Sequence, residues 1–225
     1  MSGGTDGSLR LVLFGAPGVG KGTQAAVLKE KLAVPHIATG DLLRAAMQAD
    51  TPTGRQIRKI VGSGELVPDA LVSRMIEERL TASDSVRGFL LDGYPRTLEQ
   101  AVFLDRLVER RGMRLDRVIN LELPAAEIIG RLTGRRICGA CGAIFHLRFD
   151  PPQDGARCDR CRGELRQRSD DTETAIAERL RVYRDQTEPV IEHYETQGLL
   201  TTVDGNGSPA EVTERLMQVV RALGR

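Results

Sequence analysis

Short apolar runs alternate along the chain with longer stretches of helical character. The run at residues 9–14 ends at Gly15 and predicts a buried strand, and residues 21–33 favour a helix. Further strands are expected at residues 34–38, 88–92, 117–121 and 199–203, with helical stretches between them. Strands that alternate with helices indicate an α/β fold, with a parallel five-stranded sheet and helices on both faces.

Two stretches are too long to be plain connections between a strand and a helix. Residues 38–67 contain helical pieces of their own, and residues 134–171 contain all four cysteines. We therefore expect a core made of residues 9–37, 68–133 and 172–225, with one helical insertion (38–67) and one cysteine-containing insertion (134–171). Residues 1–8 are rich in Gly and Ser and predict a flexible tail, whereas Asp170, Asp171 and Thr172 offer capping side chains for a helix that reaches about residue 197.

Composition narrows the class of protein. The chain has 225 residues, of which 40% are hydrophobic and 28% charged, as is usual for one globular domain with an inserted subdomain. The net charge of +1 does not favour binding to nucleic acid or to a membrane surface. No apolar segment approaches a membrane span and the N-terminus lacks a secretory apolar region, so we expect a cytoplasmic protein with reduced cysteines.

A phosphate-binding loop stands between the first strand and the first helix. The residues Gly15-Ala16-Pro17-Gly18-Val19-Gly20-Lys21 match the P-loop pattern Gly-x4-Gly-Lys, so the predicted α/β fold is of the P-loop type. Glycines let successive backbone N–H groups surround phosphate oxygens, the helix N-terminus adds positive potential, and the lysine reaches the outer phosphates. A glycine-rich turn without a ligand is the alternative. Gly22 separates Lys21 from Thr23, so a direct bond from a threonine hydroxyl to Mg²⁺ is not expected from the general pattern.

Arginines recur where strands end and where the cysteine insertion joins the core. Arg44 lies in a segment that follows the second strand, and Arg96 lies in one that follows the third, at the sheet edge where such folds bind ligands. Five more flank the cysteine insertion: Arg131, Arg135, Arg136, Arg168 and Arg179. Guanidinium groups bind phosphate in a bidentate manner, so this set is sufficient for a second group of phosphates.

Four motifs together resemble adenylate kinase, the family of ATP-dependent nucleoside monophosphate kinases. They are Gly-Ala-Pro-Gly-Val-Gly-Lys-Gly-Thr, Thr-Gly-Asp-Leu-Leu-Arg, Phe-Leu-Leu-Asp-Gly-Tyr-Pro-Arg-Thr and Gly-Arg-Arg-Ile-Cys, which begin at residues 15, 39, 89 and 134. The family's own Gly-Lys-Gly-Thr also has the glycine seen at position 22. The resemblance runs from about residue 9 to the C-terminus and implies the reversible reaction of ATP with AMP to form two ADP, carried out by a monomer.

The resemblance also implies site residues. For ATP they are Gly18, Val19, Gly20, Lys21, Gly22, Thr23, Arg131, Arg135, Ile144, Phe145 and Gly207. For AMP they are Thr39, Arg44, Glu65, Leu66, Val67, Gly93, Tyr94, Pro95, Arg96, Gln100, Arg168 and Arg179. The residues expected to act on the transferring phosphoryl group are Lys21, Asp92, Arg96, Arg135, Arg168 and Arg179.

The chemistry implied needs cations rather than an acid–base pair. A phosphate acceptor is already ionised at pH 7, so no general base is required, and the protein mainly aligns reactants and neutralises charge. Asp92, at the end of a strand, is expected to organise Mg²⁺ through its waters; a turn-forming Asp before Gly93 is the alternative. Because water competes with AMP as the acceptor, we expect residues 38–67 to close over AMP and residues 134–171 to close over ATP as a lid.

Two Cys-x2-Cys pairs indicate a zinc ribbon in the lid. Cys138 and Cys141 form the first pair, and Cys158 and Cys161 form the second. Four thiolates fill a tetrahedral shell and leave no position for water, so the expected Zn²⁺ is structural, in agreement with the four-cysteine lid of some adenylate kinases. Disulfides and a redox role are the alternatives, and His146 is not expected to be a ligand.

Two other functions remain open from the sequence. A kinase of the UMP/CMP type has the same phosphate loop and Asp-Gly-x-Pro-Arg element, although Thr39, Thr97 with Gln100 and the long lid favour AMP. The zinc ribbon is also compatible with a nucleic-acid-binding module on an ATP-sensing switch, which the near-neutral charge disfavours.

Overall fold

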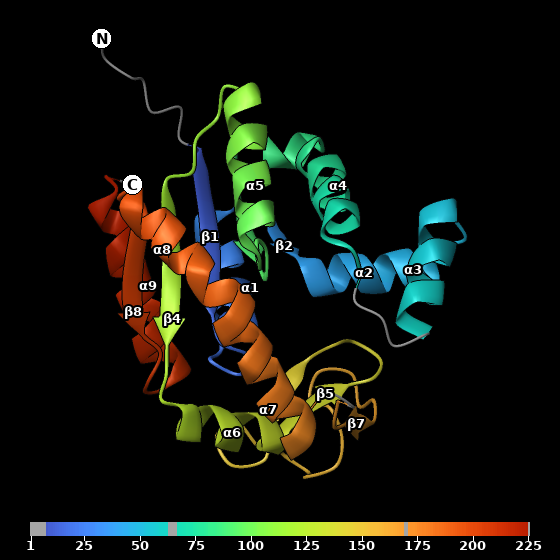
Figure 1. Cartoon of the computed structure of the whole chain (residues 1–225). Helices are drawn as coiled ribbons and strands as arrows, with labels where there is room; N and C mark the ends of the chain where they lie inside the picture. The colour runs from blue at the N-terminus through green and yellow to red at the C-terminus, as the bar shows by residue number, and fades with distance from the viewer. Residues whose placement is uncertain (1–7, 63–66, 169–170, 225) are drawn as a thin grey trace.

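Five parallel strands form the central sheet of the computed structural model, which describes residues 8–62, 67–168 and 171–224 (Figure 1). The spatial order is β2-β3-β1-β4-β8, so the strand that precedes the phosphate loop lies in the middle. The strands are β1 (Leu9–Gly15), β2 (His36–Ala38), β3 (Gly88–Asp92), β4 (Arg117–Glu122) and β8 (Leu200–Asp204). The predicted parallel five-stranded sheet is confirmed.

Helices cover both faces of this sheet, as its alternating side chains require. Leu11 and Leu13 of β1 point to a cluster shared with α1 (Lys21–Leu32) and α9 (Pro209–Ala222). Val12 and Phe14 belong to the cluster on the other face, which includes residues of α4, α5 and α8. Those helices span Asp69–Leu80, Leu98–Arg110 and Glu188–Thr196, and a 3₁₀ turn η1 (Ser83–Ser85) precedes β3.

The observed bounds differ slightly from the predicted ones. Helix α1 ends at Leu32 rather than residue 33, because Ala33 takes a left-handed conformation with φ of 51°. Strand β2 begins at His36 rather than residue 34, although the Pro35 carbonyl still accepts a hydrogen bond from Leu90 N at 2.9 Å. The last strand runs one residue later than predicted, and the Leu199 carbonyl accepts from Val118 N just before it begins.

Helices α2 (Thr39–Gln48) and α3 (Pro52–Gly62) make up the segment after β2 and extend away from the sheet (Figure 1). They pack closely, because a Cβ atom at Gly54 would lie 2.3 Å from the Ala46 carbonyl oxygen. The Arg58 guanidinium also donates to the carbonyl groups of Met47 and Ala49. These contacts join the two helices into one unit.

The cysteine-containing segment forms its own three-stranded antiparallel sheet in the order β6-β5-β7. Its strands are β5 (Arg135–Cys138), β6 (Ile144–His146) and β7 (Leu165–Arg166). Helix α6 (Ala125–Gly134) leads into this sheet and α7 (Glu173–Val182) leads out of it, and the two helices pack through Ile128, Leu132 and Ile176. In Figure 1 the small sheet lies below α2 and α3, at the end of the molecule where β4 points.

The long C-terminal helical stretch is interrupted rather than continuous. A π-helical turn η2 (Tyr183–Thr187) separates α7 from α8, and Pro189 stands in the first turn of α8. Proline has no N–H for an intrahelical bond, so the wider turn lies where the regular ladder is broken. The Thr172 side chain caps α7 by accepting from Ala175 N at 3.3 Å.

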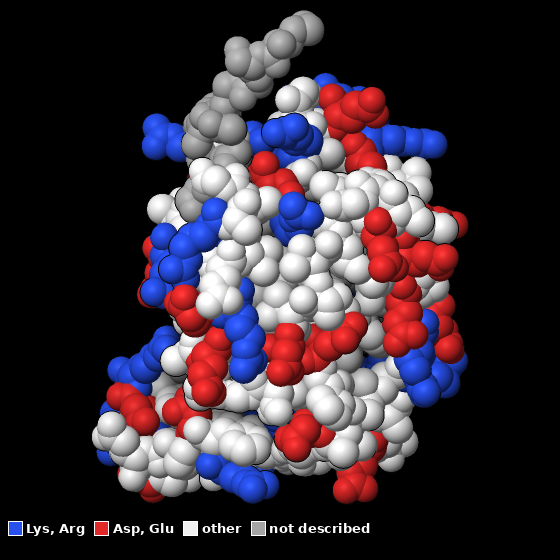
Figure 2. Space-filling view, turned by 90° about the vertical axis from the view of Figure 1, so that its left-hand side faces the viewer, with Lys and Arg blue, Asp and Glu red and all other residues white. Residues whose placement is uncertain are grey.

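The surface shown in Figure 2, on the side that carries α9 in Figure 1, mixes charges of both signs. Lys and Arg side chains stand between Asp and Glu side chains around an uncharged central area. No helix within the described ranges 8–62, 67–168 and 171–224 combines the length and apolar character that crossing a bilayer demands.

Candidate active site

The phosphate loop joins β1 to α1 at the centre of the sheet edge. Gly18 and Gly20 have φ angles of 85° and 105°, a region that side chains with a Cβ disfavour. At Gly18 a Cβ would also lie 2.6 Å from Cγ of Leu132 in α6, so glycine is required for conformation and for space. The N-terminus of α1, with its free N–H groups and positive potential, opens directly from this loop.

Lys21 is held across the loop that it follows. Its ammonium donates to the carbonyl oxygens of Gly15 at 2.6 Å and Ala16 at 3.0 Å. Burial lowers the pKa of this lysine from 10.5 to about 8, with opposition from the negative charge of Asp92 and support from the positive charges of Arg96, Arg179 and Arg135. Charges from several distant parts of the sequence therefore act on one ammonium group.

The ends of β2 and β3 supply the acidic part of the site. Asp92, whose side chain is 13% exposed, contacts Nε2 of His36 through Oδ2 at 3.2 Å. Thr39 begins α2 beside it, and its hydroxyl donates to the Gly93 carbonyl at 2.7 Å. These bonds tie the start of the α2–α3 segment to the residues that follow β3.

The loop after β3 is held by hydrogen bonds on both sides of Arg96. The Arg96 Nε atom donates to the Gly93 carbonyl at 2.9 Å, and its backbone N–H donates to Oε1 of Gln100 at 2.7 Å. The Arg96 carbonyl accepts from the Thr187 hydroxyl at 3.0 Å, which connects the loop to η2. The Tyr94–Pro95 peptide is cis, and the Tyr94 hydroxyl is 2.8 Å from Oγ of Ser73.

A buried carboxylate that the sequence assigned only to helix capping holds two of the predicted arginines. Asp171 is completely buried, and it accepts from Arg135 Nε at 2.8 Å and Nη2 at 2.6 Å. The Arg179 guanidinium donates to the same carboxylate at 3.2 Å. Asp171 therefore fixes the direction of both guanidinium groups. One indication of this role was present in the sequence, since Asp171 lies beside the arginines that border the lid.

Arg131 and Ile144 lie at the other side of the phosphate loop. Arg131 donates to the carbonyl groups of Val19 at 3.3 Å and Gly205 at 3.2 Å, which links α6 to the loop and to the turn after β8. The Ile144 Cδ1 atom lies 4.0 Å from an ideal Cβ position at Gly22, whereas Phe145 is buried inside the lid. Gly207 stands in the exposed turn before α9 with a φ angle of 107°.

The remaining predicted residues occupy mixed positions. Arg44 is exposed on α2 and forms an ion pair with Asp41. Burial lowers the pKa of Arg96, and the negative charge of Asp92 opposes this effect. The positive charge of Arg168, which lies nearby, adds to the lowering. Val67 packs at the edge of the core. Glu65 and Leu66 lie outside the described residues.

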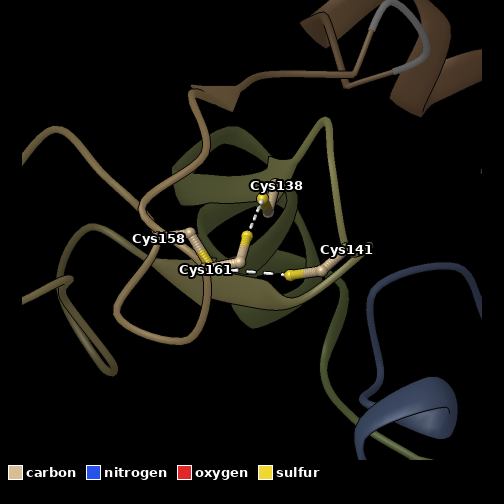
Figure 3. A group of neighbouring side chains, drawn as sticks. All are labelled: Cys138, Cys141, Cys158 and Cys161. Carbon is tan, nitrogen blue, oxygen red and sulfur yellow. Dashed lines mark hydrogen bonds between the residues drawn. The ribbon is translucent and has the colours of Figure 1, made fainter.

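The four cysteines come together in the lid, as Figure 3 shows. The Sγ atoms of Cys138 and Cys161 are 3.4 Å apart, those of Cys141 and Cys158 are 3.6 Å apart, and all four lie within 4.8 Å of one another. A tetrahedral Zn²⁺ with Zn–S bonds of about 2.3 Å requires sulfur separations of about 3.8 Å, so the cluster fits this ion. All four are free thiols, so the disulfide alternative is wrong for this structure.

Backbone N–H groups around Cys138 favour its thiolate form. Backbone N–H groups, that of Cys141 first, lower the pKa of Cys138 to about 6. A Cβ atom at Gly163 would lie 2.9 Å from Cys138 Sγ, so glycine leaves the space that this sulfur occupies. His146 is engaged elsewhere, because its Nδ1 accepts from the backbone N–H groups of Arg148 and Phe149 at 3.0 and 3.1 Å.

Comparison with known proteins places this arrangement in one family. The family model described as adenylate kinase matches residues 13–199. The chain is 46% identical to an adenylate kinase of Syntrophobacter fumaroxidans over 212 aligned residues. The alignment covers 94% of this chain and 100% of the relative. An adenylate kinase of Moorella thermoacetica is 47% identical over 217 residues, with 96% and 99% covered. One from Streptomyces griseus is 46% identical over 215 residues, with 95% and 98% covered. The chain therefore belongs to the adenylate kinase family.

Proposed function

We propose that this chain transfers the terminal phosphoryl group of ATP to AMP and forms two molecules of ADP in a reversible reaction. The observation that carries the proposal is the convergence of Asp92, Arg96, Arg135 and Arg179 on the Lys21 ammonium, at the edge where β1 and β3 end. Four cations, the three arginines and Lys21, together with one carboxylate match a reaction in which the protein aligns two sets of phosphates and neutralises their charge.

ATP is proposed to bind on the side of the phosphate loop. The loop backbone from Gly18 to Thr23 and the Lys21 ammonium would surround the outer phosphates, because the loop opens onto the N-terminus of α1. Arg131 supports this assignment, since it links the loop to the turn that precedes Gly207. Ile144 and Phe145 are proposed to approach the nucleotide from the lid, and Arg135 to reach its phosphates.

AMP is proposed to bind on the side of α2 and of the loop after β3. Arg44 and Arg96 supply guanidinium groups there, and Thr39 and Gly93 join the two segments through a hydrogen bond. The other proposed AMP residues are Glu65, Leu66, Val67, Tyr94, Pro95 and Gln100. Arg168 and Arg179 are proposed to bridge the two nucleotides, with Arg179 oriented by Asp171.

Transfer between phosphates makes a general base unnecessary. The second pKa of a phosphate monoester is about 6, so the attacking oxygen of AMP is already ionised near neutral pH. The work of this chain is then to place that oxygen in line with the leaving group and to hold guanidinium groups around the transferring phosphoryl group. Lys21, Arg96, Arg135, Arg168 and Arg179 are proposed for that task.

Two metal ions belong to the proposal. Mg²⁺ supplies charge neutralisation on the ATP phosphates, and Asp92, a carboxylate at the end of β3 within the field of Lys21, is suited to hold its waters. Zn²⁺ on Cys138, Cys141, Cys158 and Cys161 stabilises the lid, and with four protein ligands it takes no part in the reaction.

Closure is proposed to exclude water. Residues 134–171 would close over ATP and residues 38–67 over AMP, around the core formed by residues 9–37, 68–133 and 172–225. Structures with and without an inhibitor that joins both nucleotides test this, and identical positions of the two segments would contradict it. The proposal further places the enzyme in the cytoplasm. It also takes the enzyme to be a monomer, which sedimentation of the purified protein checks.

Coupled measurement of ADP formation from ATP and AMP tests the reaction itself. We expect wild-type protein to be active and Lys21→Met to lose at least about a thousandfold in kcat, because this substitution removes the ammonium beside the transferred group. Arg96→Ala should also lose most of its activity. Lys29→Met, at an exposed lysine of the same helix, is the matched control and should stay active. Absence of ADP formation by the wild-type protein would refute the proposed function.

A further inference from the structure

Asp69 connects the N-terminus of α4 to the end of the loop after β3 and the start of α5. It is the first residue of α4, directly after Pro68, and it is partly buried. Its Oδ1 atom accepts from Gln100 Nε2 at 2.8 Å, and its Oδ2 atom accepts from the Thr97 hydroxyl. Both carboxylate oxygens are thus used at the N-terminus of α5, one by its capping residue Thr97 and one by Gln100 in its first turn. Asp69 is not among the site residues predicted from the sequence.

These contacts determine which way the Gln100 amide faces. A carboxylate only accepts hydrogen bonds, so the NH₂ group must face Asp69. On the other side the amide oxygen must face the backbone N–H of Arg96, which only donates, at 2.7 Å. Rotation of the amide by half a turn would place two donors together at Arg96 and two acceptors together at Asp69.

The fixed amide keeps one further N–H and one further lone pair side by side. An amide with a donor next to an acceptor pairs with the adenine edge, which presents the 6-amino group next to a ring nitrogen. Gln100 is 4% exposed, so an amide in this position has little freedom to reorient toward a different base. Hypoxanthine presents the reversed pattern at its Watson–Crick edge and does not match an amide held in the orientation that suits adenine.

Location supports an interaction with the base rather than with the phosphate. Gln100 bonds to the main chain of Arg96, whose guanidinium is directed to the Gly93 carbonyl near Thr39. The guanidinium of Arg96 is suited to the phosphate of the acceptor nucleotide. The neutral amide of Gln100, in the first turn of α5, is suited to its base.

We infer that Asp69 is a positioning residue that fixes the Gln100 amide and thereby makes the acceptor site selective for adenine. The inference rests on the proposed function, because it concerns the acceptor of that reaction. Asp69 does not touch the nucleotide, and acts through Gln100 and Thr97.

The test compares AMP with IMP as acceptors for wild type, Asp69→Asn and Asp69→Ala. In Asp69→Ala we expect kcat/KM for AMP to fall about tenfold, as for one lost hydrogen bond, while kcat/KM for IMP changes less than about twofold. Asp69→Asn keeps one oxygen that can accept from Gln100, so its selectivity should lie between the other two. The KM for ATP should stay unchanged in both variants.

Glu99→Ala is the matched control, because Glu99 is likewise an acidic residue in the first turn of a helix but is exposed. It should retain the wild-type ratio of AMP to IMP. Equal losses with AMP and IMP in Asp69→Ala would show a merely structural role, and no loss with either acceptor would also overturn the inference. Neither result touches the proposed function, which fails only if the wild-type protein does not form ADP from ATP and AMP.

Discussion

In the core, both faces of the parallel sheet bury many large apolar side chains, whereas in the lid only a few apolar side chains pack beside the cysteines. The core clusters contain fully buried residues such as Leu11, Leu91 and Tyr194. The buried cluster of the lid consists of Cys138, Ala143, Phe145 and Cys158. The core gains its stability from removing apolar surface from water, and the lid is too small to do the same.

Under the proposed closure, this difference separates stability from movement. A segment held together by four cysteines and the proposed metal ion would remain folded while it changes position, since it does not need to bury a face against the core. At the boundary between the two regions, the carboxylate of Asp171 in the lid pairs with Arg179 of α7 in the core. The substitutions below test whether the two regions behave as separate units.

Matched truncations should show the largest contrast. Leu91→Ala removes a side chain that is completely buried in the central sheet, and should lower the free energy of unfolding by about 2–5 kcal/mol. Phe145→Ala removes a larger side chain from the lid cluster, but the main unfolding transition of the core should move much less. Denaturant unfolding followed by far-ultraviolet circular dichroism measures both. Equal losses would mean that lid and core unfold together.

Removal of the lid metal should impair activity more than global stability. We expect Cys158→Ser, or chelation of zinc, to reduce kcat by about ten- to a hundredfold, because a lid without its thiolate cluster no longer closes in a defined position. Limited proteolysis should then cut within residues 138–161, while the core remains resistant. Ala140→Ser, at an exposed position of the same lid, is the control. A Cys158→Ser variant with full activity would contradict the structural role.

Loss of the buried carboxylate at the boundary should act mainly on kcat. Asp171→Asn removes the negative charge that the guanidinium groups of Arg135 and Arg179 share, and we expect kcat to fall about tenfold with little change in either KM. Asp154→Asn removes a lid carboxylate whose partner Arg162 is exposed, and should change activity very little. A rise in KM with unchanged kcat would show that Asp171 serves binding alone.

The pH dependence should show the smallest effect. The pKa of Lys21 is lowered to about 8 from 10.5, so its positive charge is fully present only well below pH 8, is half lost near pH 8 and is absent well above it. For the free enzyme, kcat/KM for ATP should therefore fall to about half of its maximum near pH 8. The unfolded chain keeps this proton up to about pH 10.5, so the free energy of unfolding should rise as the pH increases from about 8 to 10.5. Lys21→Arg should lack this alkaline decrease.

The strands and the cysteine pairs were predictable from the sequence because their signals are local. An apolar run that ends in glycine, as at residues 9–15, determines a buried strand with few alternatives. Two Cys-x2-Cys pairs likewise bring four sulfur atoms together in a small sheet. The family resemblance that the motifs suggested is confirmed by the family match over residues 13–199.

Contacts between distant residues were not predictable in the same way. The bonds from Asp171 to Arg135 and from Asp69 to Gln100 join residues 36 and 31 positions apart, and no local pattern encodes such pairs. The π-helical turn at Tyr183–Thr187 was also missed, since periodicity alone favoured one continuous helix. In each case packing of separate elements decided the local geometry.

The ion pair of Arg135 with Asp171 also means that the lid leaves the core at nearly the place where it began. An inserted segment whose two ends lie close together alters the backbone of the core very little, whatever the length or internal structure of the segment. Over evolutionary time such a segment is free to be lengthened, shortened or rebuilt. The same junction makes it a suitable place for protein engineers to exchange one lid for another.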